Sequence, residues 1–138
     1  MSIFFPRVVI NIDSIAYNTQ KIAEICHSND IELVGVTKLA LANPEIARVM
    51  RKNGVDKLGD SRLKNIIKLY ENNVPGPYQL LRIPMISELP LAVKYADEIL
   101  VSMPETAYEI DKIVGELQKN VQIIYMIDVG DLREGVWY

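Results

Sequence analysis

The chain has 138 residues, of which 49% are hydrophobic and 24% are charged, and its formal net charge is −3. This hydrophobic fraction is enough for one globular domain with a buried core, and the acidic balance argues against nucleic-acid binding. The single cysteine, Cys26, excludes an intrachain disulfide framework. No signal-peptide pattern and no apolar run of about 20 residues is present, so we expect a cytoplasmic protein without membrane association.

Short apolar runs and amphipathic segments then alternate along the chain. Strands are predicted at residues 8–13, 31–38, 55–61, 78–84, 98–103 and 121–130, and helices at 14–29, 44–54, 62–73, 87–96 and 104–120. Capping residues follow the strands: Asp13 or Ser14 for the first helix, Asn43 before Pro44 for the second, and Asp60 or Ser61 for the third. Gly54 is the expected stop of the second helix. The alternation predicts βαβ units and a parallel α/β sheet.

Polar residues stand where most of these predicted strands end. They are Lys38, Asp60, Ser61, Arg82, Ser102 and Asp128. The carboxyl ends of parallel strands meet at one edge, where the active sites of such sheets form. Ordinary helix capping is the alternative explanation for Asp60 and the two serines. Lys38 and Arg82 are not capping residues and each follows an apolar run, so they are the stronger functional candidates.

Lys38 has two possible explanations. A partly desolvated lysine loses proton affinity, and its amine can then condense with a carbonyl such as the aldehyde of pyridoxal phosphate. Alternatively, the strand simply ends at Lys38 and the amine lies in water. The spacing of the residues leaves both explanations open.

A charged loop favours the first explanation. Residues 126–135 read MIDVGDLREG, and residues 36–38 read Val-Thr-Lys. These segments resemble the Asp-x-Gly-x-x-Arg-x-Gly loop and the Val-x-Lys segment of the pyridoxal-phosphate-dependent alanine racemase family, fold type III. The segments GDSR (59–62), LLRIPM (80–85) and IDVGDLREG (127–135) resemble its ornithine racemase-like branch.

The resemblance implies an incomplete (β/α)8 TIM-type barrel. Residues 1–138 would be the N-terminal part of the barrel, and a C-terminal β domain would be absent. Lys38 would be the internal aldimine lysine and one catalytic base, and we assign Arg82 to the cofactor as well. Arg133 and Asp60 are expected to bind the substrate, Asp60 or Glu134 by meeting a cationic side chain. No metal is expected.

The implied activity is racemisation of an amino acid, with a basic one such as ornithine as substrate, by a homodimer. This chain alone is expected to be inactive, because the second base of the family is a tyrosine from the partner's C-terminal domain. Met126 stands where alanine racemases carry a modified lysine that braces the loop arginine, so Asp128 or Asp131 is expected to brace Arg133. Ala42 replaces a phosphate-binding tyrosine of that family.

Two alternatives remain beside the racemase. One is a non-catalytic protein that binds pyridoxal phosphate for cofactor homeostasis, and the other is a flavodoxin-like domain for a phosphorylated ligand. No glycine-rich phosphate loop follows any predicted strand, which argues against the second alternative. In the incomplete barrel of the racemase interpretation, an open sheet exposes its last strand, so we expect self-association through residues 121–127.

Overall fold

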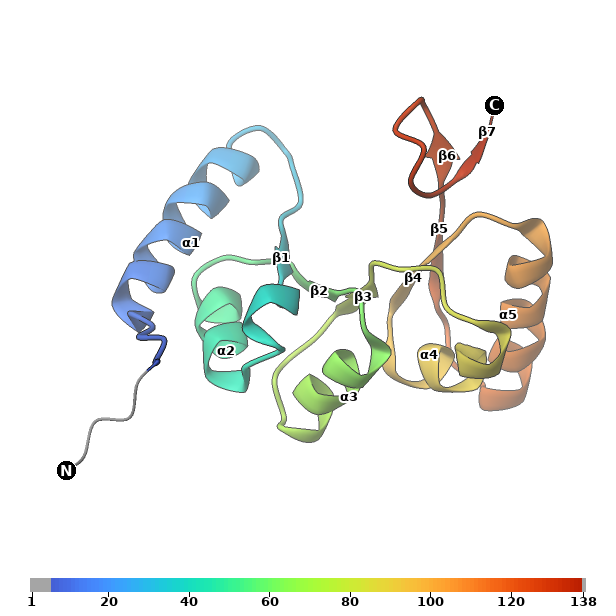
Figure 1. The fold of residues 1–138 in the computed structure, drawn as a ribbon, viewed down its shortest axis with the longest axis horizontal. Coiled ribbons are helices and arrows are strands. Elements are labelled where there is room, and N and C mark those ends of the chain that lie inside the picture. The colour runs from blue at the N-terminus through green and yellow to red at the C-terminus, as the bar shows by residue number, and fades with distance from the viewer. Residues whose placement is uncertain (1–5, 138) are drawn as a thin grey trace.

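The computed structural model describes residues 6–137, which form a parallel sheet flanked by helices (Figure 1). The helices are α1 (Ile12–His27), α2 (Pro44–Lys52), α3 (Leu63–Glu71), α4 (Leu89–Tyr95) and α5 (Pro104–Leu117), with 3-10 turns η1 (Lys38–Ala40) and η2 (Ile86–Glu88). The strands are β1 (Val34–Val36), β2 (Lys57–Asp60), β3 (Tyr78–Leu80), β4 (Glu98–Val101), β5 (Gln122–Tyr125), β6 (Ile127–Asp128) and β7 (Val136–Trp137). In the described part of the chain, no helix is long and apolar enough to cross a bilayer.

The main sheet has the order β1-β2-β3-β4-β5, and all four neighbouring pairs are parallel. Strands that follow one another in the sequence are therefore neighbours in space, as in a (β/α)8 barrel. In Figure 1, α2, α3 and α4 lie on the same side of the sheet, whereas the side between α1 and β6–β7 carries no helix. The predicted incomplete barrel is confirmed, and its first strand is the one that precedes Lys38.

The core lies between the sheet and these helices. Leu58 of β2 and Ile99 of β4 are 1% and 0% exposed, and they meet Ile66 and Leu69 of α3 in one cluster of buried side chains. Burial of each such side chain stabilises the fold by about 1.5–3 kcal/mol. Since successive strand residues point to opposite faces, Lys57 and Glu98 lie on the helix-free face of the sheet.

The ends of α2 follow the predicted signals. The Asn43 side chain accepts hydrogen bonds from the amides of Glu45 (2.9 Å) and Ile46 (3.2 Å), and Pro44 is the first helical residue. Gly54 follows the helix at a φ of +104°, and a Cβ there would lie 2.6 Å from the Ala23 Cβ. This glycine therefore ends α2 and allows α1 to approach closely.

The strand predicted at residues 8–13 is not formed. Helix α1 begins within that segment, and its N-cap is Asn11, whose Oδ1 accepts the Ser14 amide at 2.9 Å. Val8 and Val9 are 88% and 77% exposed, and no described strand pairs with them. β-branched residues favour strands mainly through cross-strand packing, which this segment lacks.

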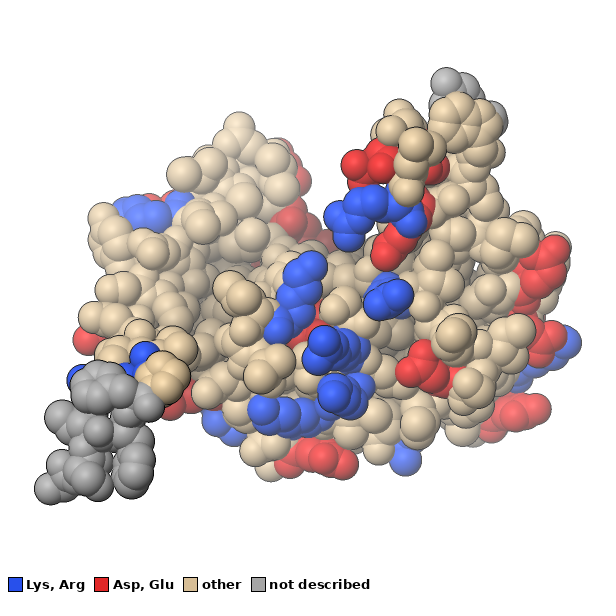
Figure 2. Space-filling view, in the orientation of Figure 1, with Lys and Arg blue, Asp and Glu red and all other residues tan. Residues whose placement is uncertain are grey.

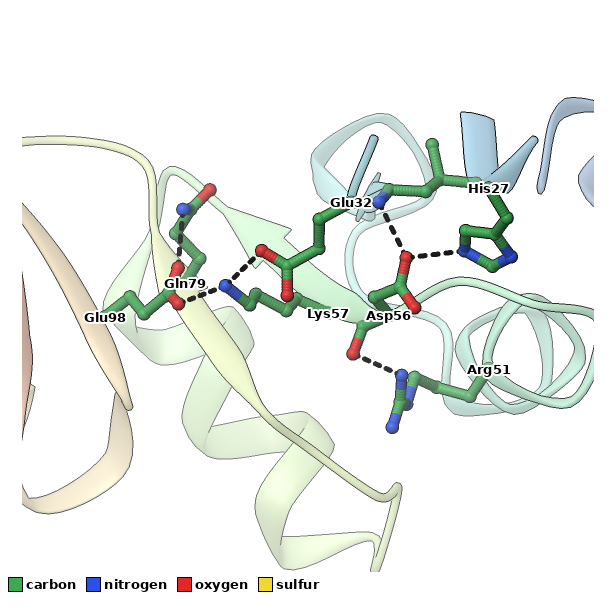
Figure 3. Close-up of polar contacts among 8 residues, drawn as sticks. His27, Glu32, Arg51, Asp56, Lys57, Gln79 and Glu98 are labelled. Carbon is green, nitrogen blue, oxygen red and sulfur yellow. Dashed lines mark hydrogen bonds and ion pairs between the residues drawn. The ribbon is translucent and has the colours of Figure 1, made fainter. Parts of the chain in front are cut away.

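Charged side chains form a network at the amino-terminal edge of the sheet (Figure 3). The Lys57 ammonium group pairs with the Glu98 carboxylate and lies 2.5 Å from Glu32 Oε2, while Gln79 donates to Glu98 at 2.8 Å. The Glu98 side chain is 5% exposed. The hydrogen bonds to Glu32 and then to Glu98 raise the pKa of Lys57.

Candidate functional site

The opposite, carboxyl-terminal edge of the sheet collects the predicted site residues. The strands end close to one another because their register is parallel, with Val36 beside Gly59 and Asp60 beside Leu80. Lys38, Asp60 and Arg82 belong to the ends of β1, β2 and β3. Arg133 lies in the loop between β6 and β7, which follows β5, the strand farthest from β1 in the sheet order. No hydrogen bond or ion pair joins these four side chains to one another among residues 6–137.

Lys38 begins the η1 turn directly after β1. Its side chain is exposed and makes no hydrogen bond or ion pair with the described residues. The amides of Ala40 (3.1 Å) and Ala42 (3.2 Å) both donate to the Thr37 carbonyl. Leu41 and Ala42 have positive φ angles of +49° and +50°. Such a conformation costs an L-residue about 1–2 kcal/mol, so the surrounding structure must hold this turn in place.

Asp60, the last residue of β2, is 0% exposed. Its Oδ2 accepts the Thr37 hydroxyl at 2.8 Å, and its Oδ1 accepts the Arg62 amide and the Asn65 side-chain amide, each at 3.0 Å. The N-cap of α3 is Arg62, without a side-chain cap, so the predicted capping by Asp60 or Ser61 is wrong. Substrate binding by Asp60 stays a prediction, and its carboxylate does not reach the surface here.

Arg82 lines a cavity of about 440 Å³ at the carboxyl-terminal edge. Arg62 and Lys64 at the start of α3 line it too, and Figure 2 shows Lys and Arg side chains gathered over this part of the molecule. These three cations have no hydrogen bond or ion pair from their side chains to the described residues. Glu88 is the acidic residue of the cavity, and its carboxylate accepts the Met85 amide at 3.1 Å. The cavity therefore suits an anionic group of a ligand.

A larger cavity of about 880 Å³ opens at the amino-terminal edge instead. Tyr70, Tyr95 and Lys119 are among its lining residues, and none of the predicted site residues lines it. The Lys119 ammonium group is already occupied by the carbonyls of Lys94 (3.1 Å) and Ala96 (2.8 Å). Its size alone does not make this cavity the functional site.

The loop after β5 is folded by its own aspartate. Asp128 Oδ1 accepts the amides of Gly130 (2.8 Å) and Leu132 (3.1 Å), which lower the pKa of Asp128 in that order. Gly135 has a φ of +114°, and a Cβ there would lie 2.7 Å from the Asp128 nitrogen, so only glycine lets the chain return to β6. Arg133 is exposed and forms no ion pair with Asp128 or with another described residue. Asp128 thus shapes the loop.

Ser102, directly after β4, is the residue whose role the sequence left undecided. It is 6% exposed, and its Oγ has no hydrogen-bond partner among the described residues. It does not cap α5, whose N-cap is Met103. An unpaired buried hydroxyl costs about 1–3 kcal/mol, so a ligand atom at this edge would satisfy it. The free Lys38 amine, the Arg82 guanidinium and this hydroxyl all follow strands at the carboxyl-terminal edge, and of the three only Arg82 lines the cavity at that edge.

The chain belongs to the alanine racemase family, because the family described as alanine racemase, N-terminal domain, matches residues 10–138. The parallel sheet with alternating helices agrees with this membership, because solved alanine racemases share the fold. Among residues 6–137, no group of three or more His, Cys, Asp or Glu side chains could hold a metal ion.

Individual relatives point to one branch of the family. The chain is 47% identical to the lysine racemase of Thermotoga maritima, over 97% of this chain and 38% of that enzyme. It is 34% identical to the ornithine racemase of Acetoanaerobium sticklandii, over 95% of this chain and 36% of that enzyme, and 27% identical to an alanine racemase of Clostridium tetani. The chain therefore spans less than two fifths of the length of these relatives. Their names agree with the resemblance to the ornithine racemase-like branch.

Solved structures share the fold. Alanine racemase from Clostridium difficile 630 superposes with a TM-score of 0.80 at 26% identity, over 93% of this chain and 34% of that one. D-threonine aldolase from Filomicrobium marinum reaches a TM-score of 0.83 at 14% identity, over 96% and 37%. PipY of Synechococcus elongatus reaches 0.73 at 20% identity, over 87% and 58%. The last two likenesses concern the fold alone.

Proposed function

We propose that the chain supplies the cofactor lysine and part of the substrate site of a pyridoxal-phosphate-dependent amino-acid racemase. The observation that carries the proposal is the place of Lys38, directly after the first strand of the sheet and on a strained turn, in a chain whose residues 10–138 match the alanine racemase family. The amine is unpartnered but exposed, so the partial desolvation expected from the sequence is not found among the described residues. Lys38 would hold the cofactor at its aldehyde group, whose oxygen would leave as water. When displaced by the amine of the substrate, the Lys38 amine would accept the α-proton, a contribution typically worth about 10²–10⁴-fold in rate.

Pyridoxal phosphate, when bound, supplies the sink for the electron pair left by the departing α-proton. Arg82 would hold an anionic group of the cofactor, in the cavity it shares with Arg62 and Lys64. The Ser102 hydroxyl would donate to a ligand oxygen, since it has no described protein partner. Arg133 would bind the substrate carboxylate, because guanidinium and carboxylate groups match geometrically.

We propose a basic amino acid such as ornithine or lysine as the substrate. This rests on the two named relatives with 47% and 34% identity, a lysine racemase and an ornithine racemase. Asp60 and Glu134 are the acidic residues that the sequence offered for a cationic side chain. Glu134 is only partly buried, whereas the Asp60 carboxylate is enclosed, so Glu134 is the better candidate for direct contact.

We further propose that residues 1–138 act as the N-terminal part of a cytoplasmic homodimer, with a C-terminal β domain supplying the second base. The 138-residue chain alone would then not racemise lysine or ornithine. Measurable racemisation by the purified chain would contradict this arrangement.

Trapping the cofactor tests the assignment of Lys38. The chain is mixed with pyridoxal phosphate, reduced with borohydride and digested, and the pyridoxylated lysines are located by peptide mass. We expect Lys38 to be labelled ahead of Lys112, which is 66% exposed and serves as the internal control. Lys38→Arg should remove the cofactor's absorbance change. Equal labelling of the two lysines, or an unchanged spectrum in the variant, would overturn the proposal.

The non-catalytic alternative predicts the same labelling, because such a protein would also bind pyridoxal phosphate. The two hypotheses differ in activity. A non-catalytic protein would bind the cofactor but would racemise no amino acid, whatever its chain length or oligomeric state. A chain of the relatives' length, assayed with lysine and ornithine, separates the two. The 47% identity to a lysine racemase favours the racemase.

A further inference from the structure

We infer that Asp60 is a positioning residue for Lys38, which it controls through the hydroxyl of Thr37. The inference rests on the role proposed above for Lys38. It assigns to Asp60 an indirect function in place of substrate contact, and it gives a function to the buried Thr37 and Asn65.

Every polar group of Thr37 is engaged, and the residue is 2% exposed. Its amide donates to the Gly59 carbonyl at 2.9 Å, which ties it to β2. Its carbonyl accepts the amides of Ala40 and Ala42, which closes the turn containing Lys38. Its hydroxyl donates to Asp60 Oδ2 at 2.8 Å. Movement of this turn would therefore break hydrogen bonds to β2, within the turn itself and to the Asp60 side chain.

Asp60 is fixed as firmly on its other oxygen. Oδ1 accepts the Arg62 amide and the Asn65 Nδ2, and Asn65 is 5% exposed. No described cation forms an ion pair with this carboxylate. Its three donors satisfy a carboxyl group that is closed off from water. Asparagine at this position would turn an NH₂ group toward Thr37, and the Thr37 hydroxyl would then have to accept that group and donate to the Gly59 carbonyl, 3.4 Å away. The carboxyl group therefore holds the Thr37 hydroxyl more firmly than an asparagine would.

The turn itself explains why such a network is needed. Leu41 and Ala42 both have left-handed φ angles, and relaxation of that strain would move Lys38, three residues earlier. The bond from Thr37 to Asp60 joins the ends of β1 and β2, and Asn65 extends it into α3. Together they hold the base of the Lys38 side chain at a fixed angle to the sheet edge.

Three variants of the 138-residue chain test this role. Thr37→Val removes the hydroxyl at nearly constant shape, Thr37→Ser keeps it, and Asp60→Asn disturbs its acceptor. The readout is the initial rate of borohydride-trapped labelling of Lys38 by pyridoxal phosphate, divided by that of Lys112. We expect Thr37→Val and Asp60→Asn to lower this ratio about tenfold, the factor that corresponds to one hydrogen bond, and Thr37→Ser to retain it.

A second readout needs no cofactor. Hydrogen exchange of the Ala40 and Ala42 amides should accelerate in Thr37→Val and Asp60→Asn, but not in Thr37→Ser. Leu69→Ala is the control, because Leu69 is 1% exposed in the core and belongs to no part of the network. At temperatures where it stays folded, this variant should keep the wild-type labelling ratio.

The outcomes separate the two proposals. Wild-type labelling that spares Lys38 overturns the proposed function and this inference with it. Wild-type labelling at Lys38 that Thr37→Val and Asp60→Asn leave unchanged overturns only the positioning role. If Thr37→Val does not fold, Asp60→Asn against Thr37→Ser decides the question by both readouts. A loss in Leu69→Ala as large as in Asp60→Asn also overturns it, because general destabilisation would then explain the effect.

Discussion

Lys38 and Asp60, at the ends of two neighbouring strands, have opposite environments. The lysine amine is exposed and has no described partner, whereas the aspartate is 0% exposed and accepts three hydrogen bonds. Their positions at strand ends made both candidates for the site, and the resemblance to the alanine racemase family then implied their roles. The hydrogen bonds distinguish the two proposed roles. An amine without a partner is available to a ligand, whereas an enclosed carboxylate can only hold the residues that donate to it.

Asp56 ties the start of β1 to the end of α1 (Figure 3). Its Oδ2 accepts the Leu33 amide at 2.7 Å and contacts His27 Nε2 at 2.8 Å. The Leu33 amide and then the His27 hydrogen bond hold the pKa of Asp56 below its ordinary value. Because the folded-state pKa is the lower one, the carboxylate stabilises the fold above the unfolded pKa of about 4. This contribution is lost as the pH falls through the folded-state pKa.

We therefore expect Asp56→Asn to lower the free energy of unfolding by about 1 kcal/mol near neutral pH. In acid below the folded-state pKa, wild type and variant should converge. Urea unfolding at the two pH values measures this, with the exposed Asp111→Asn as the control. An equal difference at both pH values would show that the charge of Asp56 is not the cause.

At the scale of elements, the Lys57–Glu98 pair joins the first residues of β2 and β4 across β3. Lys57→Met would leave the Glu98 carboxylate, with its side chain 5% exposed, without a cation. We expect this variant to lose about 3–5 kcal/mol of stability. Glu32→Gln is the matched control and should lose less than about 1 kcal/mol, because the Glu32 side chain is 56% exposed. If urea unfolding shows that Lys57→Met and Glu32→Gln lose similar amounts of stability, the Lys57–Glu98 pair does not behave as a buried ion pair.

The C-cap of helix α5 is Gln118, which is exposed and has a φ of +50°. Glycine adopts this left-handed conformation without the steric cost that glutamine bears. Gln118→Gly should therefore raise the melting temperature, with a gain of about 1 kcal/mol in the free energy of unfolding. Gln122→Gly in β5, which has no such strain, should lower it. A loss of stability in Gln118→Gly would refute the explanation.

The elements differ in how far the sequence predicted them. The Asn43-Pro44 start and the Gly54 stop of α2 are local signals, and the structure confirms both. The predicted strand at 8–13 is wrong, because strand formation depends on a partner that local composition does not reveal. The Asp60 network and the Lys57–Glu98 pair were missed for the same reason. Each joins residues that only the sheet register brings together.

At the scale of the whole molecule, the described five-stranded sheet has unpaired edges at β1 and at β5, and the edge at β5 is the one that the sequence predicted. In the main sheet β5 pairs only with β4, and Ile123 and Tyr125 are 37% and 44% exposed. Exposed apolar edge strands template the pairing of further strands. We expect the 138-residue chain to self-associate at micromolar concentration in sedimentation velocity, and Ile123→Lys to shift it to monomer. A wild-type chain that sediments as a single monomeric species would exclude edge pairing.

The network of charged side chains at the amino-terminal edge, formed by Glu32, Lys57 and Glu98, also limits which side chains can pack against it. Two carboxylates, Glu32 and Glu98, share the single ammonium group of Lys57, so this network is not electrically neutral. In a closed (β/α)8 barrel such inward-pointing side chains form a layer shielded from water. A strand that closes over this network with aliphatic side chains would strip the water from Glu32 and leave its charge unbalanced. The far wall of the barrel is therefore expected to present a guanidinium, ammonium or amide group at this height.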